Sequence, residues 1–284
     1  MLLRPTRNRR LLAPIVALSV ALPIPSGCTG PTTPDPNNLP PDIPPMGTFV
    51  IDFDDFQGDG GGGGESARIA QSIPGGDWLF AAANVGIWNT ILTVTLAVPV
   101  AAFVESFNHE PTLQSDGSWA WSYDVLVGVM LYSARLEARI TGANVNWEMY
   151  LSKSGEFTDV LWFTGESNLI TTSGNWILNR DPDNLEPFIR IDWSIDPNDE
   201  TGDVRYTNIV PDGADNGGFI FAGTTTDPEF DTFYELFNVT ADNTTFIEWN
   251  RESKAGRVMD EAQYSDTDWH CWDEMLQNTE CAEQ

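Results

Sequence analysis

The sequence has few of the side chains on which most hydrolytic and metal chemistry depends. Its 284 residues include only two histidines, His109 and His270, and three cysteines. Two separated histidines are too few for ordinary hydrolase or zinc sites, and no serine lies in a nucleophile elbow. His270 beside Cys271 fits a thiol nucleophile or a metal pair, or else a surface histidine next to a disulfide. We therefore predict a protein that is not an enzyme and has no resident cofactor.

Basic side chains are also scarce, with 14 Lys and Arg against 42 Asp and Glu and a formal net charge of −28. Four of the arginines lie within residues 1–27, which contain no acid, so ten basic side chains remain in the rest of the chain. Such a negative surface repels nucleic acid and anionic lipid headgroups. The composition argues against nucleic acid as a partner and against direct electrostatic adhesion to a membrane.

Charge is absent altogether from residues 78–104, which predicts either a membrane span or a buried helix. Asn84, Asn89 and Pro99 interrupt this stretch, and no Lys or Arg flanks it as the positive-inside rule requires. Apolar residues recur at three- and four-residue spacing, at Val85, Trp88, Leu92, Leu96, Val100 and Phe103. We therefore expect a core helix within residues 66–108, lying against the concave side of a sheet.

The N-terminus has the layout of an export signal. Arginines up to Arg10 precede the short apolar run 11–22, which is typical of a signal peptide over residues 1–27. The following Pro25-Ser26-Gly27-Cys28 resembles the lipobox of bacterial lipoproteins, in which small residues precede an acylated cysteine. The resemblance implies an exported protein, lipid-anchored through Cys28 in the cell envelope or at the cell surface. Ordinary signal-peptidase cleavage after Ala21 is the alternative.

Residues 28–65 have the composition of a tether. Residues 29–46 contain seven prolines, which favours an extended spacer, and Gly60–Gly64 is a flexible hinge. Between them, Phe49–Phe53 is predicted to form a short strand.

From residue 119 the apolar pattern has a period of two, which is typical of strands with one buried face. Examples are the apolar residues Ala134, Leu136, Ala138 and Ile140, then Val145, Trp147, Met149 and Leu151, then Ile189, Ile191, Trp193 and Ile195. Turn residues separate the runs, at Asp116-Gly117, 153–155, 172–174, 196–199, 211–213 and 241–243. Residues 66–284 are thus predicted to be one mainly β domain with a long helix (α+β). Nine or ten strands within 119–260 form an antiparallel up-and-down sheet, either a half-barrel or a barrel, packed on the apolar helix.

The C-terminal tail, residues 261–284, is predicted to contain a short helix and a turn. Cys271 and Cys281 are interpreted as a disulfide, which requires the chain to reverse between them because ten helical residues would separate them by about 15 Å.

This outline is similar to bacterial lipoprotein and lipid carriers with open-barrel folds, and more loosely to lipocalins. The segment Trp269–Asp273, with the sequence Trp-His-Cys-Trp-Asp, also resembles the end of uncharacterised exported bacterial lipoproteins. The carrier resemblance implies a non-enzymatic envelope lipoprotein that carries a hydrophobic small molecule or acts as an interaction module.

Two other functions are compatible with the residues. A glycan- or calcium-dependent adhesive domain would use Trp269 and Trp272 as a stacking platform, or acidic turns such as Asp196, Asp199 and Asp203 as calcium ligands. A glycoside hydrolase would need two opposed carboxylates. Its candidates lie on the polar faces of predicted strands, at Glu137, Glu148, Glu166, Asp192 and Glu248.

The lipobox resemblance makes a direct prediction. Cys28→Ser should move the protein from the membrane fraction to the soluble fraction and abolish incorporation of labelled fatty acid, because the acyl acceptor is lost. Fractionation and metabolic labelling of the two proteins measure this. A wild-type protein that is already soluble and unlabelled would contradict the lipid anchor.

Overall fold

A computed structural model describes residues 39–51, 56 and 76–282. The predicted signal peptide, Cys28, the glycine run and residues 66–75 lie outside the described residues. Pro40–Gln284 form one compact unit. Its helices are the 3-10 helix η1 (Met46–Thr48), α3 (Asp77–Ser106) and α4 (Glu261–Tyr264). The strands described are β1 (Thr112–Leu113), β2 (Trp119–Val127), β3 (Met130–Thr141), β4 (Asn144–Lys153), β5 (Phe157–Asn168), β6 (Ser173–Asp181), β7 (Asn184–Asp196), β8 (Thr201–Asn208), β9 (Phe219–Thr224), β10 (Thr232–Asn238), β11 (Asn243–Trp249), β12 (Gly256–Met259), β13 (His270–Trp272) and β14 (Asn278–Thr279).

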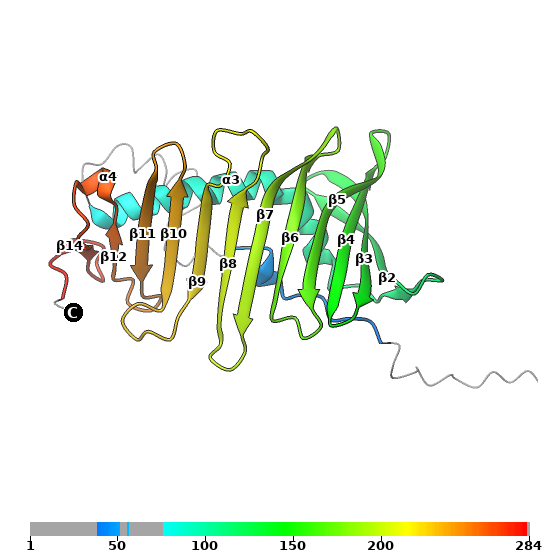
Figure 1. The fold of residues 1–284 in the computed structure, drawn as a ribbon, viewed down its shortest axis with the longest axis horizontal. Helices are drawn as coiled ribbons and strands as arrows, with labels where there is room; N and C mark the ends of the chain where they lie inside the picture. Colours follow the sequence, from blue (N-terminus) through cyan, green and yellow to red (C-terminus); the bar gives the residue numbers. More distant parts are fainter. Residues whose placement is uncertain (1–38, 52–55, 57–75, 283–284) are drawn as a thin grey trace, which may run out of the picture. The chain divides into compact units, whose positions relative to one another are not determined.

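The strands form a single open sheet in which each strand pairs with its neighbours in sequence (Figure 1). All pairs are antiparallel, so the predicted up-and-down sheet is confirmed, and the sheet is not closed into a barrel. The alternating pattern sets the register. One row of buried side chains runs straight across five strands through Leu136, Met149, Phe163, Leu178 and Ile189. This row lies on the buried inner face of the sheet, which the two-residue period of apolar side chains predicted.

The sheet is longer than the sequence pattern indicated, with fourteen strands instead of nine or ten. Strands of two to four residues, such as β1 and β12–β14, are too short to show a period. In the tail, the predicted short helix is present as the single turn α4, and β13 and β14, which were not predicted, continue the sheet. The disulfide Cys271–Cys281 is present, with a Cα–Cα distance of 5.3 Å, and the chain reverses at residues 273–277.

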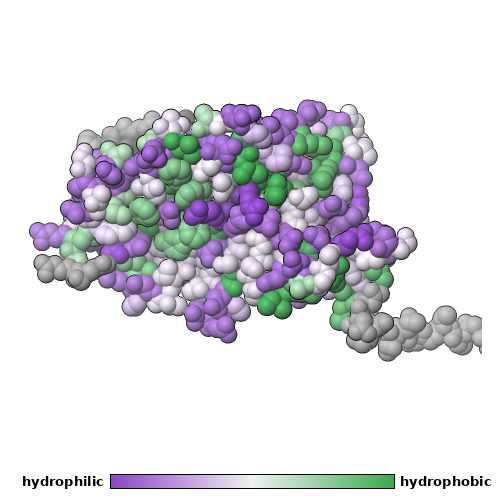
Figure 2. All heavy atoms as spheres, viewed as in Figure 1, coloured by the Kyte–Doolittle hydropathy of each residue, from purple (hydrophilic) through white to green (hydrophobic). Residues whose placement is uncertain are grey.

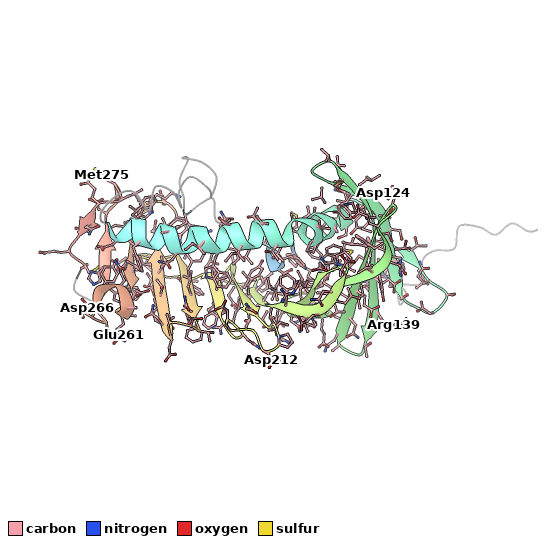
Figure 3. The ribbon with its side chains drawn as sticks, turned by 90° about the horizontal axis from the view of Figure 1, so that it is seen from above. Asp124, Arg139, Asp212, Glu261, Asp266 and Met275 are labelled. Atoms are coloured by element: carbon pink, nitrogen blue, oxygen red, sulfur yellow. A yellow bond between two sulfur atoms is a disulfide. The ribbon has the colours of Figure 1, made fainter. Side chains whose placement is uncertain are left out.

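Helix α3 runs across the strands on one face of the sheet (Figure 1). Its N-terminal end lies near the last strands, where Asn278 Oδ1 accepts a hydrogen bond from the Asp77 backbone N–H at 2.8 Å. Its C-terminal end lies on β2, where the Tyr123 hydroxyl donates to the Ala102 carbonyl at 2.6 Å. The N-terminal half of the sheet bends toward the side on which α3 lies (Figure 3). The predicted core helix is confirmed. Of the apolar residues at three- and four-residue spacing, Val85, Leu92, Leu96 and Phe103 are buried.

The segment before α3 is part of the packed body. Residues 46–48 form η1. Residues 49–51, the described part of the predicted strand Phe49–Phe53, are not in the sheet. The Phe49 side chain is fully buried, and its ring lies 5.0 Å from Phe103 and 4.9 Å from Phe163 between centroids. Residues that composition assigned to the tether thus fill the space between α3 and the sheet.

Three tryptophans on the inner face lie opposite a glycine on the neighbouring strand. The register pairs are Gly165 with Trp176, Gly174 with Trp193 and Gly256 with Trp272. A Cβ added to any of these glycines would collide with the indole of its partner. Because glycine has no side chain, the indole can lie flat on the neighbouring strand. Gly174 was expected to lie in a turn, but it belongs to β6 for this reason.

The glycine–tryptophan pairs predict opposite effects for two alanine substitutions. Gly165→Ala should lower the free energy of unfolding by about 1–3 kcal/mol, because the new Cβ overlaps Trp176 and lies 2.8 Å from the Asn175 carbonyl oxygen. Gly86→Ala, inside α3 with no atom within 4 Å of the new Cβ, should raise it by up to about 1 kcal/mol. Urea unfolding of both variants measures this. Equal effects of the two substitutions would contradict the packing.

Candidate ligand-binding cavities

A cavity of about 560 Å³, called the α3 cavity below, lies between α3 and strands β6–β11. Its helix wall consists of Asn84, Ile87, Trp88, Ile91 and Thr95. The sheet contributes buried apolar side chains, namely Ile189, Tyr206 and Leu236. This volume lies within the range of small-molecule sites, which are mostly apolar with a few polar groups at defined places.

Three polar side chains that the strands contribute to the α3 cavity lie at one end of the sheet. Arg180, Asn208 and Asn238 all line the cavity and lie at the C-terminal ends of β6, β8 and β10. These even-numbered strands run in the same direction, so the three side chains lie along the same edge. Asp215, from the β8–β9 connection, also lines the cavity and accepts a hydrogen bond from the Thr240 hydroxyl at 3.0 Å. The cavity thus combines apolar side chains of α3 and the sheet with a polar rim at these strand ends, and the helix adds Asn84 and Thr95.

A smaller cavity of about 310 Å³ lies between α3 and the N-terminal segment. It is lined by Phe49–Ile51 and by the helix residues Leu92, Leu96 and Val100. Tyr206 lines both cavities. Burial raises the pKa of the Tyr206 hydroxyl well above its ordinary value, and a backbone hydrogen bond with Ile51 opposes that rise. Tyr206 therefore stays uncharged at every physiological pH and connects the sheet to the N-terminal segment.

Helix α3 also presents apolar side chains to solvent. Ile87, Ile91 and Val94 are 54%, 45% and 75% exposed, and no charged residue lies between Asp77 and Glu105. Of the described helices, α3 is the one long and apolar enough to cross a membrane by length and composition. The face of the sheet turned away from α3 is different, because hydrophilic residues cover much of it (Figure 2).

The two tryptophans proposed as a glycan platform differ in their exposure to solvent. Trp272 is 1% exposed, its indole N–H donates to the Lys254 carbonyl at 2.8 Å, and it packs near Phe56. The expectation that Trp272 is exposed is wrong, because β13 places its side chain in the core. Trp269 is partly exposed, but the Arg257 guanidinium lies 4.3 Å from its ring centroid and covers that face.

The acidic turn proposed for calcium is already hydrogen-bonded within the protein. Asp196 accepts from the backbone and side-chain nitrogens of Asn198, at 2.8 and 3.1 Å, and these bonds lower the pKa of its carboxyl group. Asp203 accepts from the Ser194 hydroxyl at 2.6 Å. Asp199 lies in the turn between β7 and β8. Within the described ranges, no group of three or more His, Cys, Asp or Glu side chains is arranged to hold a metal ion.

The carboxylates considered for glycoside hydrolysis lie on several strands and line neither of these two cavities. Glu137 and Glu148 are direct register partners, but Arg135 pairs with Glu137 and the Tyr150 hydroxyl donates to Glu148 at 2.9 Å. Asp192 pairs with Arg190, and Glu248 accepts from Arg257 Nε at 2.7 Å. These groups form ion pairs and hydrogen bonds along the outer face of the sheet.

Sequence reasoning missed the residues that line the α3 cavity. The lack of charge in residues 78–104 identified the helix wall, but nothing in the sequence brings Arg180, Asn208 and Asn238 to one edge. Their juxtaposition depends on the strand order and directions. A comparison of the chain with family models, with curated proteins and with solved structures finds no match.

Phe49 packs between α3 and the sheet, which predicts a large effect of Phe49→Ala. Removing this fully buried ring should lower the free energy of unfolding by about 3–5 kcal/mol. Val50→Ala is the matched control, because the neighbouring Val50 is 40% exposed and should change stability by less than about 1 kcal/mol. Chemical unfolding of both variants measures this. A Phe49→Ala protein as stable as the control would place this segment outside the core.

Proposed function

We propose that the protein is a lipid-anchored envelope protein that binds a hydrophobic or amphipathic ligand in the α3 cavity. The observation that carries the proposal is a cavity of about 560 Å³ lined by apolar side chains of α3 and the sheet, with Arg180, Asn208 and Asn238 together at one end of the strands. Burial of apolar surface lowers the free energy by about 25 cal/mol for each Å² removed from water. A ligand with an acyl or similar apolar chain therefore suits the interior better than a polar one.

The rim indicates where the polar end of such a ligand would lie. Arg180, Asn208 and Asn238 offer hydrogen-bond donors at the strand ends, and the nearest anion to Arg180 among the described ion pairs is Glu186, at 3.7 Å. At this distance the Arg180 guanidinium retains N–H donors for a carboxylate or ester head group. An amphipathic ligand would place its chain between α3 and the sheet and its head group at this rim.

The anchoring proposed for Cys28 supports this function. A lipid anchor would hold the body near a membrane, where hydrophobic ligands are found, and the segment before the body would set its reach. The apolar side chains Ile87 and Ile91, 54% and 45% exposed, line the cavity on the helix side, where an apolar chain would contact them.

Two substitutions on α3 test the site. Ile91→Glu should weaken binding of a fluorescent long-chain fatty acid by at least about tenfold, because it places a carboxylate on the apolar wall. Val94→Glu is the matched control, because it introduces the same carboxylate about one turn away on α3. Val94 is 75% exposed and lines none of the cavities, so this variant should bind the probe like wild type. Fluorescence titration gives both dissociation constants, and circular dichroism confirms folding.

Wild-type protein that binds no acyl probe, and that co-purifies from its host with no lipid detectable by mass spectrometry, would overturn the proposed function. Equal loss in both variants would show that the probe binds the exposed face of α3 instead of the cavity.

A further inference from the structure

The hairpin between β2 and β3 exposes a cluster of apolar side chains at its end. Residues 126–131, called the hairpin tip below, contain no polar side chain. Four large aliphatic side chains of the tip are between 46% and 89% exposed: Leu126, Val129, Met130 and Leu131. Single exposed aliphatic residues are common on protein surfaces, whereas a contiguous group of them marks a site of interaction.

The hairpin tip projects beyond the strands beside it. On one side, β4 pairs with β3 only from Ser133 onward. On the other side, β1 pairs with β2 only at Trp119 and Ala120. Neither of these two strands is paired with residues 126–131, so the tip is a free two-stranded ribbon. Because side chains alternate between the faces of a strand, aliphatic groups project from both sides of this ribbon.

The turn at the end of the hairpin tip is tight and apolar. Val127 and Met130 are register partners, so the turn consists of the two residues Gly128 and Val129. Gly128 has a φ of 62°, which a two-residue hairpin turn requires at its first central position. Asn, Asp, Ser and Gly are the usual residues of such turns. The turn geometry therefore gives no reason for Val129, which is 89% exposed.

The hairpin tip also differs from the other turns along its edge of the sheet. Strand β2 is even-numbered, so its C-terminal end lies on the same edge as those of β4, β6, β8, β10 and β12. Each of the connections that follow these other strands contains an acidic residue, such as Glu156, Asp183, Asp212, Asp242 and Asp266. The absence of charge is thus a property of the tip and not of the whole edge.

Charge and shape indicate what the hairpin tip fits. A second copy of this chain is disfavoured, because each copy has a formal net charge of −28. The tip also lacks the Trp, Tyr and Arg side chains that dominate binding between proteins. The end of a ribbon is convex, and purely aliphatic side chains need neither a shaped pocket nor hydrogen bonds when hydrocarbon surrounds them.

The length of the uncharged stretch matches a lipid surface. Asp124, labelled in Figure 3, and Arg135 are the nearest charged residues in the sequence on either side of the tip. Asp124 lies four residues before Gly128, about 13 Å along an extended strand. Apolar segments at a membrane surface are buried about 5–10 Å deep. The whole tip can therefore enter the acyl region while Asp124 stays among the headgroups.

We propose that the hairpin tip inserts into the surface of a lipid bilayer with zwitterionic headgroups. Anionic headgroups would repel the acidic body. The contact is weak and reversible, as binding through a single acyl chain is, so a Cys28→Ser protein still fractionates as soluble. The contact depends neither on acylation of Cys28 nor on a ligand in the α3 cavity.

A fluorescent label at the turn tests the insertion. Val129→Cys in the full-length Cys28→Ser chain provides a thiol for an environment-sensitive dye, since Cys271 and Cys281 form a disulfide. Phosphatidylcholine vesicles should raise the dye emission and shift it to shorter wavelength in a saturable manner. The same dye at Val94→Cys, on the exposed face of α3, should not respond. No response at residue 129, or a response at residue 94 alone, would overturn the proposal.

Two aspartate substitutions locate the contact. Leu126→Asp should weaken partitioning of the Cys28→Ser protein into these vesicles by at least about tenfold, because it places a carboxylate in the inserted tip. Ile170→Asp is the matched control, because Ile170 is 75% exposed in the β5–β6 turn at the opposite edge of the sheet. Partitioning of this variant should be unchanged. Equal weakening by both substitutions would overturn the proposal.

Lipid composition and fatty-acid binding complete the test. Addition of phosphatidylglycerol to the vesicles should weaken partitioning, and partitioning that requires this anionic lipid would contradict an apolar contact. Leu126 does not line the α3 cavity, so Leu126→Asp should bind the fluorescent fatty acid like wild type. Failure of the membrane contact therefore leaves the proposed ligand site standing.

Discussion

The packing of α3 across the inner face of the sheet is the interaction on which the rest of the structure depends. An open antiparallel sheet with one apolar face must cover that face, because its large side chains would otherwise meet water. Four aromatic rings lie at the centre of the contact between α3 and the sheet, with centroids about 5–6 Å apart: Phe49, Phe103, Phe163 and Trp176. They join the N-terminal segment, the helix and the sheet into one core.

The same arrangement accounts for the cavities. A single helix is about 10 Å wide, so it cannot by itself cover the whole inner face of a curved sheet of fourteen strands. Spaces therefore remain beside α3, and the N-terminal segment fills only part of them. Many of the side chains that face these spaces, such as Ile91, Ile189 and Leu236, are apolar for the same reason that the core is.

Glycine has a different role in this sheet from the one its sequence context indicates. Gly117 and Gly155 lie in turns with positive φ, as their neighbours predicted, whereas Gly174 lies within a strand because Trp193 covers it. A glycine next to serine and threonine indicates a turn when the sequence is considered alone. Only the register shows that an indole from the neighbouring strand occupies the place of its side chain.

Local pattern determined much of this protein before its tertiary structure was known. The uncharged run 78–104 and the period of two after residue 119 each reflect which side chains avoid water, so they predicted the helix, the meander and their contact. The isolated pair Cys271 and Cys281 indicated a disulfide, and their spacing required the chain to reverse between them. The tertiary structure decided the burial of Trp272, the packing of Phe49 and the cavities. Each of these depends on which strands become neighbours. The hydrophobic effect is not directional, so the pattern of apolar residues in the sequence does not specify which strands pair.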